Sequence, residues 1–419
     1  MLFLYNLILF LLFIPAAFFL LLSTKVKAGS FFAQIKERFC APSFNLTQGK
    51  EVLWVHCSSL GEVRAVEPLL KSLNNYSIHL TTLTISGKNY ALNNSICSSI
   101  SLAPADFTFV ANNFVKKLKP SALIIVETEL WPGIIFAAKK IGARVLLVNA
   151  RLSEKSFPIY SKTAFFWRKV LEKIDFLQAR YPSDSERFIS LGVPKEKTSI
   201  SGNIKYDRDF STFSLKKEEL GFNAQDVVLV AGSVRDGEEE IFLNAWLAAL
   251  KENNNLKLVF APRHLENLNT IYELLNKNGL SFIKYSNVNF AQIATPYPVI
   301  VLDKFGELQK LYSIADLAFV GGSLIKKGGQ NPIEPAAYGV AVLFGESMEN
   351  FLPEANLLID AGGALRVRGS LELTKTMVEL SLNLQLRKKM GQLARNVVNL
   401  QRGALNKAVE LIKLATKTK

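Results

Sequence analysis

The sequence has few residues of the kinds that form disulfides or bind metals. It contains 3 cysteines and 3 histidines among 419 residues. Cys40, Cys57 and Cys97 are widely spaced and form no C-x-x-C pair, which argues against a disulfide framework or a zinc site and fits a reducing compartment. The histidines are dispersed, and neither an H-E-x-x-H motif nor a P-loop motif occurs. We therefore expect no metal and no cofactor.

Charged residues are absent from the first 24 positions. Leu2 to Leu22 is apolar apart from Asn6, and the first charged residue is Lys25. A helix of this length spans roughly 30 Å, the thickness of the hydrocarbon core of a bilayer. Because the basic residues follow the apolar segment instead of preceding it, a transmembrane anchor over 1–23 is favoured over a cleaved signal peptide. The same charge pattern predicts that the rest of the chain lies in the cytoplasm.

Acidic residues are fewer than basic ones. The 50 Lys and Arg against 36 Asp and Glu give a net charge of +14, which favours an anionic partner: nucleic acid, phospholipid or a phosphorylated small molecule. No aromatic and basic RNA motif or recognition helix stands out, so nucleic acid is not expected. Apolar residues make up 49% of the chain, which excludes a disordered protein.

The chain is long enough for two domains, since single cores stop growing at roughly 250 to 300 residues. Short apolar segments alternate with helical patterns in two series, which predicts two doubly wound α/β (Rossmann-like) domains with parallel sheets. A polar stretch over 203–220 separates the series. We predict domains over 24–212 and 213–419, the second including a closing C-terminal helix, which face a central cleft because ligands bind at the carboxyl ends of parallel strands. The ten segments expected as strands are 52–56, 78–82, 122–126, 144–148, 176–179, 227–231, 256–261, 299–302, 317–320 and 340–344.

Acidic residues follow two of the strands expected in the first domain. Glu62 occupies the first turn of a helix, where it is a candidate general base or only a complement to the helix dipole, and the helix N-terminus is expected to lower its basicity. Glu127 and Glu129 share the loop after another strand, either as an acid and base couple or as caps of backbone donors. Lys205, beside the linker, is a phosphate partner or a solvated lysine, and Asp207-Arg-Asp209 reads as a solvated turn.

The second domain contains two segments suited to binding an anion. Arg263 and His264 follow a strand, so the guanidinium can bind a phosphate. A glycine-rich run, 321–331, leads through Pro332 into a helix. We interpret this run as a nucleotide site in which backbone amides take the phosphate and Glu334 binds the ribose hydroxyls.

Seven motifs occur in order along nearly the whole chain. They are S-x-G-E at Glu62, E-T-E-L-W-P at 127–132, N-A-R-L-S at 149–153, G-N-I-K-Y-D at 202–207, P-R-H at 262–264, G-E-L at 306–308 and F-V-G-G-S-L…G-G-x-N-P-x-E-P-A-A at 319–337. Together they resemble the bacterial lipid A-specific 3-deoxy-D-manno-octulosonic acid (Kdo) transferases, glycosyltransferase family 30. The resemblance implies a GT-B fold, an inner-membrane location and transfer of Kdo from CMP-Kdo to a lipid A precursor, with inversion and without a metal.

The resemblance also implies roles for individual residues. Glu62 would deprotonate the acceptor hydroxyl, while Glu127 and Lys205 would stabilise the transition state; we favour Glu127 over Glu129. Another transferase using a UDP-sugar, and a non-catalytic nucleotide-binding membrane protein, are the alternatives. The residues implied in binding CMP are Pro262, Arg263, Phe305, Gly306, Glu307, Asn331, Pro332, Ile333 and Glu334.

Overall fold

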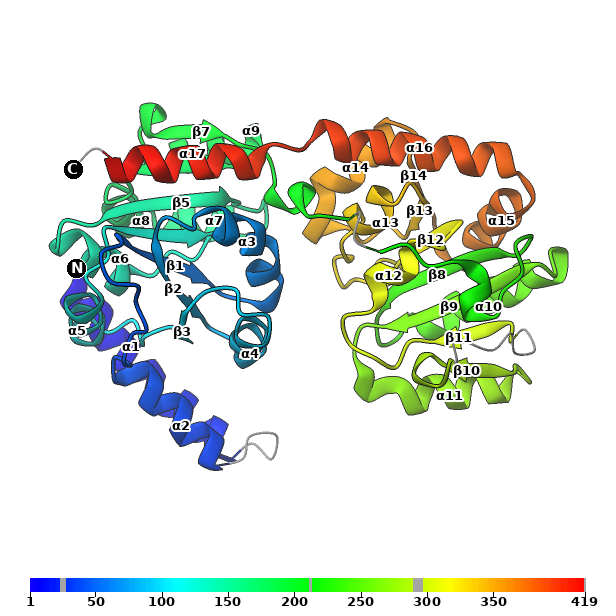
Figure 1. The fold of residues 1–419 in the computed structure, drawn as a ribbon, viewed down its shortest axis with the longest axis horizontal. Helices are drawn as coiled ribbons and strands as arrows, with labels where there is room; N and C mark the ends of the chain where they lie inside the picture. The colour runs from blue at the N-terminus through cyan, green and yellow to red at the C-terminus, as the bar shows by residue number, and fades with distance from the viewer. Residues whose placement is uncertain (23–27, 211–212, 289–296, 418–419) are drawn as a thin grey trace. The chain divides into compact units, whose positions relative to one another are not determined.

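The computed structural model describes residues 1–22, 28–210, 213–288 and 297–417, and for 13–22 and 28–30 it describes the backbone only. These residues form two compact units. The first comprises 1–208 and 402–419, and the second comprises 209–401 (Figure 1). The sequence instead assigned 402–419 to the second domain. The two doubly wound α/β units that it predicted are confirmed.

The described part of the first unit contains a parallel sheet of seven strands in the order β3-β2-β1-β4-β5-β6-β7. The strands are β1 Val52–Cys57, β2 Ser77–Thr82, β3 Ser99–Leu102, β4 Ala122–Val126, β5 Arg144–Ala150, β6 Phe176–Ala179 and β7 Thr198–Ile200. The chain builds one half of the sheet outward from β1 and then returns to its other side with β4. The carboxyl ends of β1 and β4 therefore form a topological switch point, where ligands of such sheets bind.

Helices cover both faces of this sheet (Figure 1). The helices of the first unit are α1 Leu2–Leu22, α2 Ala28–Phe39, α3 Leu60–Ser72, α4 Ile85–Asn93, α5 Thr108–Leu118, α6 Pro132–Lys140, α7 Phe157–Lys162, α8 Ala164–Leu171, α9 Pro182–Ser190 and α17 Ala404–Lys417.

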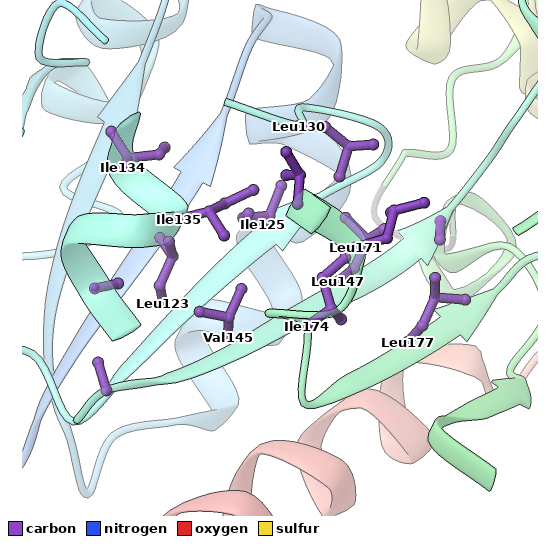
Figure 2. Packing of buried hydrophobic residues seen from close by; sticks show 14 of the residues in the cluster. Leu123, Ile125, Leu130, Ile134, Ile135, Val145, Leu147, Leu171, Ile174 and Leu177 are labelled. Atoms are coloured by element: carbon purple, nitrogen blue, oxygen red, sulfur yellow. The ribbon is translucent and has the colours of Figure 1, made fainter. Parts of the chain in front are cut away.

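Alternate side chains of each strand enter two different cores. Trp54 of β1 packs with α5 and α6, whereas Leu53 and Val55 pack with α3 and α17. Figure 2 shows the first of these cores, in which Ile135 of α6 and Leu147 of β5 pack together with apolar neighbours. Because both faces of the sheet are buried, the strands read as continuous apolar runs, and this is why the sequence revealed them.

The second unit repeats the design with the order β10-β11-β9-β8-β12-β13-β14. Its strands are β8 Val227–Val234, β9 Leu256–Pro262, β10 Phe282–Lys284, β11 Val299–Val301, β12 Leu317–Val320, β13 Ala341–Phe344 and β14 Ala364–Arg366. Its helices are α10 Glu239–Glu252, α11 Leu268–Lys277, α12 Leu308–Tyr312, α13 Ile333–Ala337, α14 Leu352–Asp360, α15 Gly369–Leu382 and α16 Leu384–Leu400. Here β8 and β12 flank the switch point, so the loops after them are the expected ligand loops.

The predicted anchor over 1–23 corresponds to α1, but residue 23 and the side chains from 13 onward lie outside the described part. The first turns of α1 contact the first unit: the Tyr5 hydroxyl donates to Asp106 over 2.6 Å, and the Thr108 amide donates to Asn6 over 3.0 Å. In the residues that the structure describes, we find no helix with the length and apolarity needed to cross a membrane. The predicted transmembrane helix is therefore not supported.

Candidate active site

The switch point of the first sheet brings Glu62 and Glu127 to neighbouring strand ends. β1 and β4 pair in parallel, with His56 beside Ile125, so both strands end at the same edge. Glu62 follows β1 in the first turn of α3, and Glu127 directly follows β4. The two acids that the sequence singled out in separate motifs are thus parts of one site.

Glu62 is held in place by the turn that precedes its helix. Ser59 caps α3 and accepts a hydrogen bond from the Glu62 amide over 3.3 Å. The Glu62 carboxylate in turn accepts from the Ser58 amide over 2.6 Å and from the Ser58 hydroxyl over 2.5 Å. This reciprocal arrangement is a variant of the capping box, and it fixes the orientation of the carboxylate.

The surroundings of Glu62 make it more basic than an ordinary carboxylate. Its side chain is buried, and burial together with the charge of Glu127 raises its pKa to about 7, although the bonds from Ser58 oppose this rise. The sequence led us to expect the opposite direction, because a helix N-terminus favours the ionised form. Desolvation and a neighbouring like charge outweigh the helix dipole here, and they give Glu62 the pKa of a general base near neutral pH.

Glu127 lies in surroundings that stabilise its negative charge. Its backbone has φ +62°, an uncommon value outside glycine, and its amide donates to the Val148 carbonyl over 3.0 Å. The carboxylate forms ion pairs with Arg180 and, over 3.3 Å, with Lys205. Burial alone would raise the pKa of Glu127, but Arg180, Lys205 and Arg151 lower it to about 2.

Asn149 aligns both cations that pair with Glu127. It is the penultimate residue of β5, has φ +54° and is almost fully buried. Its backbone carbonyl accepts from Nε of Arg180 over 3.2 Å, and its side-chain oxygen accepts from the amide of Ile204 over 3.1 Å. Ile204 opens the short helix η2, Ile204–Asp207, which carries Lys205. The motifs around Asn149 and Lys205 therefore converge on the carboxylate of Glu127.

Glu129 has a different environment from Glu127. Its carboxylate accepts from the indole nitrogen of Trp131 over 2.8 Å. The loop between β4 and α6 is further held by Asp106, which accepts from the amides of Gly133 and Ile134, each over 2.8 Å. Of the two acids in this loop, it is Glu127 that contacts Lys205.

Asp207 caps a helix that comes from the other end of the chain. Its two carboxylate oxygens accept from the amides of Gly403 and Leu405, over 2.6 Å and 2.7 Å. These amides open α17, so the carboxylate satisfies donors that a helix start leaves unpaired. The prediction that this segment is a solvated turn is wrong for Asp207.

In the second unit, a buried carboxylate accepts hydrogen bonds from backbone amides of the glycine-rich run. Glu238 is fully buried, and it accepts from the amides of Gly322, Ser323 and Leu324 and from that of Arg235, the last over 2.8 Å. We expected the amides of this run to bind a phosphate. Those of 322–324 bind Glu238 instead, which orders the loop after β12 against the loop after β8.

Two glycines of this run are required by the backbone. A Cβ atom at Gly321 would lie 2.4 Å from the Ser233 carbonyl oxygen, and Gly322 has φ +70°. Glu334, which the sequence predicted to bind the ribose, lies just after the end of the run. The side-chain oxygen of Asn331 accepts from the amide of Ile333 over 3.1 Å, and its side-chain nitrogen donates to Glu334 over 3.5 Å. Pro332 is buried and precedes the first residue of α13, one position later than the sequence indicated.

The other residues implied in binding CMP follow β9 and β11. Pro262 ends β9, and Arg263 is exposed, with its amide donating to Val234 over 2.8 Å. Phe305 is 59% exposed, and Gly306 has φ +91°. Glu307 accepts from the Tyr285 hydroxyl over 3.2 Å and pairs with Lys310 over 2.8 Å. Strands β11, β9, β8 and β12 are neighbours and run parallel in the sheet, so the loops that follow them lie together at the carboxyl ends of the strands.

Neither unit shows a metal centre in its described residues: no three of the side chains from His, Cys, Asp and Glu gather closely enough to hold an ion. The cations at the acidic site of the first unit are Lys205 and Arg180, and both pair with Glu127. Sequence reasoning missed Arg180 and Glu238. Both lack a motif signal, because each acts through a partner that is remote in the sequence.

Comparisons with known proteins agree with the motifs. Residues 33–208 match the family described as 3-Deoxy-D-manno-octulosonic-acid transferase (kdotransferase). A 3-deoxy-D-manno-octulosonic acid transferase from Haemophilus influenzae is 33% identical over 86% of this chain and 86% of its own length. A bifunctional glycosyltransferase/methyltransferase from Fusobacterium nucleatum is 36% identical over 80% of this chain, which spans about half of that protein, 53%.

The fold is shared with solved glycosyltransferases. A crystal structure of a glycosyltransferase from Rickettsia africae matches 88% of this chain and 100% of its own, with a TM-score of 0.60 and 14% identity. That likeness concerns the fold of the chain, two parallel-sheet α/β domains like those of GT-B glycosyltransferases. The identity and coverage of the Haemophilus influenzae relative, together with the family match over 33–208, show that the chain belongs to the 3-deoxy-D-manno-octulosonic acid transferase family.

Proposed function

We propose that the protein transfers Kdo from CMP-Kdo to a hydroxyl group of a lipid A precursor, with inversion at the anomeric carbon. The observation that carries this proposal is the buried Glu62, oriented by Ser58 and with its pKa raised to about 7, beside the cation-paired Glu127. Membership of the Kdo transferase family supports the choice of sugar.

In the proposed reaction, ionised Glu62 takes the proton of the acceptor hydroxyl. The acceptor oxygen forms a bond to the anomeric carbon of Kdo while the bond from that carbon to the CMP phosphate oxygen breaks. CMP leaves with the bonding electron pair, and Glu62 retains the proton. Because this is a single displacement from the face opposite the leaving group, the configuration inverts.

Glu127, Lys205 and Arg180 would act as a fixed electrostatic group. The sugar carbon gains positive charge as the donor bond breaks, and a carboxylate that stays ionised stabilises such charge. Arg180 and Lys205 keep Glu127 ionised, and Asn149 holds both in position. Glu62 and Glu127 are thus two carboxylates whose pKa values are driven apart, the pattern that separates a base from a permanently charged stabiliser.

The second unit would bind the donor. Arg263 is exposed after β9 and suits the CMP phosphate, with Pro262 before it in the strand. Glu334, aligned by Asn331 at α13, suits the ribose hydroxyls, and the loop of Phe305, Gly306 and Glu307 would contribute further contacts. The amides of 322–324 bind Glu238 and are not needed in this assignment.

We further propose that the reaction takes place on the cytoplasmic side of the inner membrane. The apolar segment at the N-terminus supports this location: Phe3 and Leu12 of α1 are 82% and 63% exposed, and apolar side chains that face outward favour a lipid surface. Fractionation of cells would test it. Recovery of the protein in the washed membrane fraction is expected, and recovery in the soluble fraction would contradict it.

The direct test of the proposed function is incubation of the full-length protein with CMP-Kdo and a tetraacyl lipid A precursor, followed by mass spectrometry. We expect the mass of the acceptor to increase by one or more Kdo residues, with release of CMP. UDP-sugars serve as control donors. Transfer from a UDP-sugar but not from CMP-Kdo would overturn the proposed donor, and no transfer from either would overturn the assignment as a transferase.

A further inference from the structure

One face of the first turns of α1 lies against the first unit. Among residues 1–10, the half-buried positions are Leu2, Tyr5, Asn6 and Leu9, and the others are exposed. Positions three and four residues apart lie on one side of a helix. The Tyr5 ring also lies 6.0 Å from the ring of Phe166 in α8, measured between the ring centroids. The helix is therefore docked through a defined face, and two members of this face are polar.

Two helices of the first unit begin without a cap from their own segment of the chain. α5 follows β3 and α6 follows β4, and in neither helix does the side chain of the preceding residue accept a hydrogen bond. The start of a helix leaves several backbone amides unpaired, and a buried start needs acceptors from elsewhere in the protein. Both starts lie at the carboxyl edge of the sheet, the edge at which Glu127 is found.

Asn6 and Asp106 supply the acceptors that these two starts lack. The side-chain oxygen of Asn6 accepts from the amide of Thr108, the first residue of α5, over 3.0 Å. The Asp106 carboxylate accepts from the amides of Gly133 and Ile134, each over 2.8 Å. These are the second and third residues of α6, the positions that the side chain of a capping residue ordinarily serves. Asp106 therefore acts as the cap of α6 from outside its segment.

The position of Asp106 is fixed by three segments of the chain. A Cβ atom at Gly133 would lie 2.7 Å from Oδ1 of Asp106, so this close approach to α6 requires glycine. The backbone just before Asp106 is held by α2, because the amide of Ala105 donates to the carbonyl of Arg38 over 2.9 Å. The Tyr5 hydroxyl donates to the buried carboxylate over 2.6 Å. This last bond joins α1 to the start of α6.

The start of α6 is also one end of the loop that carries Glu127. The other end is held by the amide of Glu127, which donates to the carbonyl of Val148 over 3.0 Å. Between these two points, Glu127 has φ +62°, an uncommon conformation that persists only where the surrounding structure holds it. Release of the start of α6 would let the loop relax and move the carboxylate of Glu127 relative to Lys205.

We propose that Asp106 is a positioning residue for Glu127, and that Tyr5 of α1 completes the set of donors that holds Asp106. The first turns of α1 then take part in the reaction itself, in addition to any attachment to a lipid surface. The effect on the reaction rests on the proposed function, because the role of Glu127 does. The contact between α1 and the start of α6 does not rest on it and is measured without substrates.

The contact is tested by hydrogen exchange of the full-length protein in detergent. Tyr5→Phe removes one hydroxyl group and keeps the ring. We expect exchange in the segment 127–135 to become about 10- to 100-fold faster, the factor that corresponds to one lost hydrogen bond to a charged acceptor. Tyr76→Phe is the matched control, since it loses a hydroxyl bond to Thr416 in the same unit and should leave this segment unchanged. Equal exchange in Tyr5→Phe and the wild type would overturn the proposal.

The role in the reaction is tested by transfer rates in the same detergent, where attachment to a membrane does not limit the rate. In Asp106→Asn, we expect kcat to fall by about 10- to 100-fold with unchanged affinity for CMP, because a shift of a catalytic group by about 1 Å has an effect of this size. Tyr5→Phe should lower kcat by a smaller factor, and Tyr76→Phe should not change it. An unchanged kcat in Asp106→Asn, or a change confined to KM for the acceptor, would refute the positioning role.

A double variant separates positioning from a general loss of stability. If Asp106 acts through Glu127, adding Asp106→Asn to Glu127→Gln should change the rate by no more than about twofold. Two effects that multiply would show that Asp106 acts elsewhere, which contradicts the proposal. If the wild type transfers no sugar from any donor while Tyr5→Phe still accelerates exchange, the proposed function fails and the positioning role with it, but the contact between α1 and α6 stands.

Discussion

Glu62, which is buried, and Glu127, which is partly buried, show how two acids at neighbouring strand ends acquire opposite properties. Glu62 has hydroxyl and amide partners but no cation within ion-pair distance among the described residues, so burial raises its pKa. Glu127 has Arg180 and Lys205, which more than offset its burial. The composition of the two motifs did not reveal this difference, because Arg180 is supplied by the end of β6, far along the chain.

Removing the basic oxygen of Glu62 should abolish most of the transfer. In Glu62→Gln, we expect kcat to fall by about 10²- to 10⁴-fold, because general base catalysis contributes that much, while CMP binding is unchanged. Glu67→Gln is the matched control: Glu67 lies on the same helix and pairs with Lys71. Steady-state rates and CMP titrations measure the two effects. If both variants retained full activity, Glu62 would not be the base.

The raised pKa of Glu62 predicts a pH dependence. A base must be ionised to accept a proton, and the ionised fraction of Glu62 falls as the pH falls through about 7. The ratio kcat/KM should therefore decrease about tenfold per unit below pH 7 and level off above it. A rate that stays constant down to pH 5 would assign the base to another group. Glu127, with its pKa lowered to about 2, stays ionised throughout.

Arg180 belongs to no motif of the sequence, but its ion pair with Glu127 should contribute to the stability of the protein. Arg180→Met leaves the partly buried carboxylate of Glu127 with Lys205 as its remaining ion-pair partner. Removal of one member of a fully buried pair reduces the free energy of unfolding by about 3–5 kcal/mol, which is the upper limit expected here. Arg144→Met is the control, since its pair with Asp175 is partly exposed and worth about 0–1 kcal/mol. Chemical denaturation compares the two. Equal losses would contradict the importance of Arg180.

At the scale of elements, Glu238 connects the loop after β8 with the loop after β12, because its carboxylate accepts hydrogen bonds from amides of both. The sequence showed three consecutive acids at the start of a helix and gave no reason to distinguish Glu238 from its neighbours. What distinguishes Glu238 is the glycine-rich run 84 residues later in the chain, whose Gly322 amide bonds to it. Pairings of this kind follow from sheet order and cannot be read from local patterns.

Glu238→Gln should loosen the donor loop. The amide side chain carries no charge and replaces one acceptor oxygen with a donor group, which would face a backbone amide. We expect stability to fall by about 1–3 kcal/mol and KM for the donor to rise, with kcat less affected. Glu240→Gln, on the exposed side of the same helix, is the control. Unchanged donor KM in Glu238→Gln would show that the loop does not need this carboxylate.

The strands that the sequence revealed differ from those it missed in length and burial. Ten apolar segments were predicted, and each corresponds to a strand of the structure. The missed strands β3, β7, β10 and β14 have 3 or 4 residues, and β7 and β10 carry exposed or half-buried side chains. They lie at or near the sheet edges, where one-sided burial removes the continuous apolar run on which the prediction depends.

At the scale of the whole molecule, the last helix belongs to the first unit although the sequence places it after the second. The sequence predicts a closing C-terminal helix, but local patterns do not say which sheet this helix covers. The structure shows Ala408 and Ile412 in one core with Val55 of β1, and Asp207 caps the start of the helix. The chain thus passes twice between the units, near 208 and near 402.

This assignment predicts which unit loses stability when the apolar stripe of α17 is cut back. Ile412 is fully buried, so Ile412→Ala should destabilise the first unit by about 2–5 kcal/mol, the usual effect of removing a large core side chain. Hydrogen exchange should then accelerate in β1 and β4 but not in β8 and β12. Leu414→Ala, at a position that is 57% exposed, should change neither unit by more than about 0.5 kcal/mol. Faster exchange confined to the second unit would mean that α17 packs there instead.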